Sequence, residues 1–145
     1  MRALPLAVLA LVGCVCASAT EARTALLQYK IAEVLQSSEF KEKVGDDVAF
    51  YFGNQPTPPV AEKFGDYRSE KTTNAVGKSD DVSCRRAVLS ALIQFHDRAI
   101  QLGGNAVINM TGFSNIKDND GEYECRAGGF VTRVLLKGTV VKLGR

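Results

Sequence analysis

A long amphipathic segment, residues 80–102, limits the fold more than any other feature of this sequence. Apolar side chains recur along it at steps of three and four residues, the spacing that forms one buried stripe on a helix. Gly103 and Gly104 follow directly, and glycine most easily adopts the positive φ at which helices commonly end. We expect Asp80 or Asp81 to cap the start of this helix. The stripe consists of Cys84, Val88, Ala91, Leu92, Phe95, Ala99 and Leu102.

Segments of β-branched and aromatic residues on both sides of the helix predict strands. Loop 53–59 contains three prolines, which lack the backbone donor that sheet pairing requires. Gly138 interrupts the last apolar stretch, and we expect a turn or bulge there between two strands. Residues 31–35 and 38–44 predict short helices, the second capped by Ser38. The expected strands are 48–52, 64–73, 105–110, 122–127, 130–136 and 139–143, and Thr24–Tyr29 is either a strand or the lead-in to a helix.

These elements together predict an α+β fold, in which one long helix packs on a small, mostly antiparallel sheet within a single domain, residues 20–145. The chain has 18 Lys and Arg against 16 Asp and Glu, without a basic run. Because nucleic-acid binding requires a strong positive footprint, we expect no nucleic-acid partner.

The first nineteen residues have the three-part layout of a bacterial-type secretory signal. Ala17-Ser18-Ala19 is a site for ordinary signal peptidase, and a cut after Ala22 is a later variant. Leu11-Val12-Gly13-Cys14 also matches a lipobox, which would leave an acylated Cys14 at the new N-terminus. We favour a periplasmic protein without a lipid, because lipidation leaves Cys16 unpaired in an oxidising space. An outer-membrane lipoprotein is the alternative, and we expect a membrane contact only if Cys14 is lipidated.

Cys84 and Cys125 are the two cysteines that remain after a cut at Ala19 or Ala22. Cys84 lies on the inward stripe of the helix, and Cys125 shares a strand face with Tyr123 and Ala127. Two inward cysteines on facing layers can reach the Cα separation of a disulfide. We therefore predict a Cys84–Cys125 disulfide. Two buried free thiols, or a redox or metal site, are the alternatives.

Several short motifs resemble ligand sites without completing them. Gly77-Lys78-Ser79 matches the end of a phosphate-binding loop, but Thr72 stands where its first glycine is required. Asp118–Glu122 resembles part of a calcium loop, but its register puts apolar residues where carboxylates are needed. His96, the single histidine, lies at the flank of the helix stripe, where a boundary role is expected. We expect no enzyme, no catalytic residue, no cofactor and no metal site.

Several sequence blocks, in a fixed order and spacing, carry a family resemblance: Lys71–Ser79, Cys84 with its helix, Gly103–Asn109, Tyr123–Cys125 and Leu136–Leu143. They resemble a family of small exported proteobacterial proteins of unknown function, many of which carry the automatic label excinuclease ATPase subunit. The helix followed by Gly-Asn-Ala-Val-Ile is also similar to the YbjQ-like and RcsF-like fold group. That resemblance implies a helix on a small sheet, disulfide bonding and a tendency to self-associate. Some YbjQ-like domains are described as heavy-metal binders.

From these observations we expect a non-catalytic periplasmic or envelope protein that acts as a protein-interaction or sensor-like module. Its expected partner is another envelope protein or a second copy of itself. A periplasmic module that binds a small ligand or a metal is the alternative.

Overall fold

The structure is a computed structural model that describes residues 24–114 and 121–145. The predicted signal peptide, its cleavage sites, Cys14 and most of the Asp118–Glu122 motif lie outside these ranges. The described elements are β1 (Thr24–Lys30), α1 (Ile31–Leu35), α2 (Ser38–Lys43), β2 (Ala49–Phe52), β3 (Val60–Asn74), α3 (Asp80–Leu102), β4 (Ala106–Thr111), β5 (Glu122–Gly128) and β6 (Val131–Leu143).

Strand β6 is the centre of the sheet, because three other strands pair with it. β3 pairs with it in antiparallel fashion along its whole length, from Asn74 opposite Val131 to Val60 opposite Leu143. β5 and β4, also antiparallel, share the other edge, β5 near the start of β6 and β4 near its end. β1 pairs with β5 in antiparallel fashion, and β2 pairs with β4 in parallel. The predicted α+β class with a mostly antiparallel sheet is confirmed.

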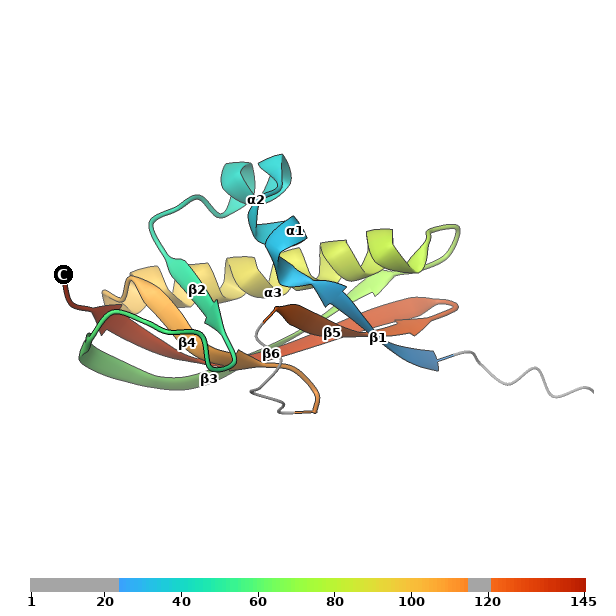
Figure 1. The fold of residues 1–145 in the computed structure, drawn as a ribbon. Coiled ribbons are helices and arrows are strands. Elements are labelled where there is room, and N and C mark those ends of the chain that lie inside the picture. Colours follow the sequence, from blue (N-terminus) through green and yellow to red (C-terminus); the bar gives the residue numbers. More distant parts are fainter. Residues whose placement is uncertain (1–23, 115–120) are drawn as a thin grey trace, which may run out of the picture.

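Helix α3 lies across one face of this sheet, over β3 and β6 (Figure 1). The predicted stripe is buried from Cys84 to Ala99, and Leu102 is half-buried at its end. The helix ends at Gly103, whose φ of 81° confirms the predicted left-handed terminus. Within the described ranges, no helix combines the length and the apolar character needed to cross a membrane.

Both predicted helix caps are one or two residues too late. Ser37 caps α2, since its Oγ accepts a hydrogen bond of 3.1 Å from the Phe40 N–H. Ser79 occupies the N-cap position of α3, so Asp80 and Asp81 lie in the first turn, where negative charge favours the helix dipole. A hydrogen bond with Ser79 holds the pKa of the Asp81 carboxyl below its usual value.

The prediction of a turn or bulge at Gly138 is wrong, because β6 runs through it without interruption. A Cβ at this position would lie 2.7 Å from Val107 Cγ1 and 3.1 Å from Met110 Cγ. Glycine is therefore required for close packing of β4 on β6. The bulge occurs in β4 itself, where Ile108 pairs with Thr139 but Thr111 pairs with Lys137.

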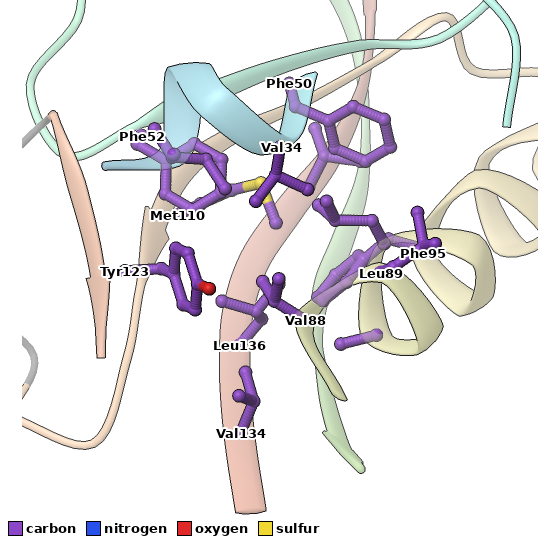
Figure 2. Packing of buried hydrophobic residues seen from close by; sticks show 14 of the residues in the cluster. Val34, Phe50, Phe52, Val88, Leu89, Phe95, Met110, Tyr123, Val134 and Leu136 are labelled. Carbon is purple, nitrogen blue, oxygen red and sulfur yellow. The ribbon is translucent and has the colours of Figure 1, made fainter. Parts of the chain in front are cut away.

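The main core lies between α3 and the sheet, and α1, α2 and β2 close its side. Figure 2 shows Val34 of α1, Phe50 and Phe52 of β2, and Met110 of β4 within one apolar cluster. Phe40 of α2 meets Phe50 edge to face, with ring centroids 6.0 Å apart. The short N-terminal helices thus fix the position of β2, and through it the position of β4.

Candidate functional site

The bulge in β4 turns Asn109 to the open face of the sheet, the face away from α3. Asn109 has a φ of 54°, in the left-handed region that asparagine tolerates better than most residues. The pairing register of β4 shifts by one residue relative to both of its neighbours, β2 and β6. The strand therefore has one extra residue at this point, and it is paired on both sides of the bulge. Val107 and Met110, on either side of the bulged residues Ile108 and Asn109, are buried in the main core, whereas Asn109 is exposed.

A hollow of about 510 Å³ lies beside Asn109 on this face. Along β3, Asp66 and Arg68 alternate with Tyr67, whose ring lies 5.1 Å from the Arg98 guanidinium carbon of α3. Since alternate residues of a strand face opposite sides, Asp66 and Arg68 point away from the helix. Their partners on β6, Thr139 and Lys137, do the same. We call this the open-face hollow; its lining consists of Lys63, Asp66, Tyr67, Arg68, Asn109, Lys137, Gly138 and Thr139.

The charge around the open-face hollow is predominantly positive. Lys63, Arg68 and Lys137 line it together with one carboxylate, Asp66. The Asp66 carboxylate accepts a hydrogen bond of 2.6 Å from the Thr139 hydroxyl and lies 3.8 Å from the Lys63 ammonium. Because the side chains of Lys63 and Asp66 are 62% and 74% exposed, this ion pair contributes little to stability. The Lys63 ammonium can therefore exchange this carboxylate for an anionic group of a ligand.

Glu70 extends this charged surface along β3 toward the start of β6. Its carboxylate lies 3.1 Å from Arg68 Nη2 and 3.3 Å from Arg133 Nε, so one acid is shared by two arginines. Glu70 and Arg133 thus add one negative and one positive charge beyond the hollow, and the excess of cations on this part of the open face comes from the hollow itself.

The predicted disulfide is present, and it lies away from this hollow. Cys84 of α3 and Cys125 of β5 are bonded, with their Cα atoms 5.9 Å apart, and both are fully buried. Tyr123 and Ala127 share the inward face of β5 with Cys125, as predicted. The alternative of two free thiols is thus wrong. The bond joins the long helix to the sheet inside the core, which is a structural role.

His96 joins α3 to the segment between α2 and β2, in agreement with its predicted boundary position. Its Nε2 lies 2.8 Å from an Asp47 carboxylate oxygen, and its Nδ1 lies 3.2 Å from one of Asp97. Partial burial lowers the pKa of His96, but the hydrogen bonds and negative charges of the two carboxylates outweigh it, and the pKa is raised overall. The hydrogen bond with His96 in turn lowers the pKa of Asp47.

The residues that resemble a phosphate-binding loop form the turn that leads into α3. The Lys78 ammonium donates to the Asn74 carbonyl at 3.1 Å, and the Val76 N–H donates to the Asn74 side chain at 2.8 Å. Gly77 has a φ of 71°, which the turn requires. In residues 24–114 and 121–145, no three His, Cys, Asp or Glu side chains lie close enough together to hold a metal ion.

In comparisons with known proteins, no family model, no curated protein and no solved structure matches this chain. The family resemblance of the sequence blocks therefore stays a prediction.

Sequence reasoning did not assign any residue of the open-face hollow to a binding site; Gly138 was interpreted only as a turn or bulge. The only local sign of the hollow is the charge at alternate positions of β3, Asp66, Arg68 and Glu70, which places three charges on one strand face.

Proposed function

We propose that this protein is a non-catalytic extracytoplasmic binding module that holds an acidic segment of a partner protein in the open-face hollow. The observation that carries the proposal is the lining of this hollow: three cationic side chains and one carboxylate on an exposed sheet face. Electrostatic complementarity of this kind attracts and orients acidic partners. Asn109 and Thr139 add polar groups that can hydrogen-bond carboxylates or backbone.

The exposure of the hollow favours a polypeptide over a small molecule. Small-molecule sites bury about 70–90% of their ligand. Here the cationic walls are open to solvent, since the side chains of Lys63 and Arg68 are 62% and 63% exposed. A protein partner gains affinity from a wide area around such a hollow, whereas a small ligand contacts only its walls. The volume of about 510 Å³ nevertheless lies within the usual range for ligand pockets, so a small anion is the second candidate.

The disulfide and the N-terminal sequence support an extracytoplasmic location. Structural disulfides persist in oxidising compartments, and residues 1–19 have the layout of a secretory signal. We place the protein in the periplasm, with an outer-membrane lipoprotein acylated at Cys14 as the alternative. The absence of a recognised catalytic arrangement in the sequence underlies the expectation that it is not an enzyme.

An acidic peptide tests this proposal directly. We expect hexaglutamate, added to the isotope-labelled protein, to shift the amide resonances of Asn109 and Thr139, with an effect that weakens as salt is raised. The charge reversals Arg68→Glu and Lys137→Glu should abolish these shifts. Lys142→Glu, at an exposed position of β6 outside the hollow, is the matched control and should leave them intact.

Three results decide between the candidates. Shifts that follow hexaglutamate and vanish in the two reversals support the acidic-segment proposal. If free glutamate or phosphate produces the same shifts with similar affinity, the hollow is a small-anion site. If hexaglutamate leaves Asn109 and Thr139 unchanged at low salt, the proposed function is wrong.

A further inference from the structure

Strand β3 has one edge that no other described strand covers. Among residues 24–114 and 121–145, it pairs with β6 alone, although it is fifteen residues long. Its helix-facing side chains at Tyr67, Lys71 and Thr73 are only half-buried, whereas Val134 and Leu136 on the same face of β6 are fully buried. This difference in burial is typical of a strand at the margin of a sheet. Such an edge offers backbone donors and acceptors to a further strand.

One hydrogen bond at the end of β3 shows which backbone groups face this edge. The Ala75 N–H donates to the Phe130 carbonyl at 2.9 Å, in the register that sets Asn74 opposite Val131. In an antiparallel pair, residues bonded to the partner strand alternate with residues whose N–H and C=O face away from it. Ala75 is a bonded residue, so the even-numbered residues before it face away from β6. The Asn74 carbonyl agrees with this, since it accepts a hydrogen bond of 3.1 Å from the Lys78 ammonium.

The uncovered part of this edge is the segment Asp66–Thr72. At one end Asn74 is already bonded to the loop before α3, and at the other the register of β3 is irregular between Lys63 and Gly65. Ser69 is the midpoint of the segment. Within it, the residues that turn their backbone groups outward also have exposed side chains on the open face: Asp66, Arg68, Glu70 and Thr72.

The order of charges in this segment is complementary to itself. When two copies of residues 66–72 are placed antiparallel with Ser69 opposite Ser69, Arg68 of each copy lies opposite Glu70 of the other. Asp66 then lies opposite Thr72, whose hydroxyl can donate to the carboxylate. Opposite charges at directly paired positions stabilise a sheet. In this register every outward-facing residue of the segment has a hydrogen-bonding partner in the other copy.

The neighbouring registers are unfavourable, because they bring like charges together. With Arg68 at the centre, two arginines are opposite each other and Asp66 is opposite Glu70. With Glu70 at the centre, two glutamates are opposite each other. Registers that are shifted further run into the irregular end or the loop-bonded end of β3. Charges on an edge strand ordinarily prevent pairing between molecules. Here they exclude these registers and permit the one that uses the whole uncovered segment.

We propose that two copies of this chain pair through the β3 edge, antiparallel about a two-fold axis at Ser69, so that their sheets form one continuous sheet. A two-fold dimer uses the same surface on both copies, and a self-complementary segment provides such a surface. A strand of another protein could also bond to this backbone. The second copy is favoured because it carries the matching charges in the matching order.

This inference does not rest on the proposed function. The dimer depends on the edge of β3, whereas the hollow lies on its open face. Asp66 and Arg68 belong to both surfaces, but Glu70 is outside the lining of the hollow. The first test of the dimer therefore changes Glu70.

The exported protein, purified with its disulfide formed, is studied by sedimentation equilibrium over a range of concentrations. We expect a mass that rises from one copy to two copies and no further. Glu70→Arg puts like charges at both symmetric pairs and should weaken the dimer at least about tenfold. Arg68→Glu/Glu70→Arg places opposite charges there again and should restore it. Both variants put an arginine beside Arg133, so a difference between them reports the pairing across copies.

Two further variants separate the edge from general effects of charge. Glu42→Arg, the same reversal at an exposed position of α2, is the matched control and should leave the dimer unchanged. Thr72→Pro removes one outward-facing donor without removing a bond to β6, and it should also weaken the dimer. Circular dichroism checks that each variant is folded.

Introduced cysteines test the register. Ser69→Cys sets two thiols opposite each other at the axis, where the Cα atoms of a directly opposed pair are about 4.5 Å apart, and mild oxidation should link the copies. Thr73→Cys, on the same face of β3, is the control, because position 73 lies opposite Gly65 of the second copy in this register. It should not form the link.

A single copy at every concentration would overturn the proposal, and so would an assembly larger than two copies. A dimer that persists unchanged in both Glu70→Arg and Thr72→Pro would show that another surface holds it. A link through Thr73→Cys and none through Ser69→Cys would exclude the proposed axis.

Discussion

Removal of the Cys84–Cys125 disulfide is expected to cost a large part of the free energy of folding. The bond joins residues that are 41 positions apart in the sequence. In the chain-entropy model, a closed loop of this length lowers the entropy of the unfolded chain enough to stabilise the fold by about 4 kcal/mol. Both side chains are fully buried, so the variant Cys84→Ala/Cys125→Ala also loses packing. At about 0.8 kcal/mol for each buried methylene-sized group, this adds roughly 1–2 kcal/mol.

The expected total is therefore about 5–6 kcal/mol, against a typical stability of about 5–15 kcal/mol for a domain. We expect the double variant to be close to its unfolding transition at 37 °C. A guanidinium titration monitored by circular dichroism measures this loss of stability as a lower midpoint concentration of denaturant. The slope of the transition should rise at the same time, because the unfolded chain without its bond exposes more surface.

A double-mutant cycle separates the bond from the packing. Either single variant already breaks the disulfide, so each should cost about 5 kcal/mol, while the double variant costs only slightly more. The coupling energy between the two positions should then be about 4 kcal/mol. Additive single effects with a sum below about 2 kcal/mol would refute this reasoning.

Two further predictions concern Gly138 and His96. Gly138→Ala should destabilise the fold by about 1–3 kcal/mol in the same titration, because its Cβ would lie 2.7 Å from Val107 Cγ1. Gly129→Ala is the control. A Cβ at position 129 has no atom within 4 Å, so this change should leave the stability nearly unchanged. Because the pKa of His96 is higher in the folded chain, its protonated form stabilises the fold below about pH 6.5, and this contribution is lost as the pH rises through the folded-state pKa. The unfolding midpoint should fall as the pH is raised from below about 6.5 through the folded-state pKa, and His96→Gln should remove that step. An identical step in the variant would contradict the assignment.

Periodic and paired features of the sequence were sufficient to predict the fold class, helix α3 and the disulfide. The stripe of α3 and the inward face of β5 arise from local spacing, and spacing is visible in the sequence. The helix caps were predicted too late because each true cap is followed by residues that cap helices equally well. Ser38 follows Ser37, and Asp80 and Asp81 follow Ser79. Only the backbone geometry shows which of these adjacent residues is the cap.

Gly138 and the open-face hollow could not be predicted, for a different reason. A glycine between two apolar segments resembles a turn, and its real role depends on Val107 and Met110, which precede it by about thirty residues. The hollow combines charges from β3 and β6 with a bulge in β4. Its composition depends on strand register, and register is set by pairing between distant segments.

The forked pairing along β6 has a consequence for how the domain opens. Pairing with β5 ends at Arg133 and pairing with β4 begins at Lys137, so the sheet consists of two halves that are joined by the β3–β6 ribbon. The disulfide fastens only the β1–β5 half to α3. The β2–β4 half, which contributes Asn109 to the open-face hollow, is held by noncovalent contacts alone. We therefore expect its amide hydrogens to exchange with solvent earlier than those of β5, as a separate cooperative unit.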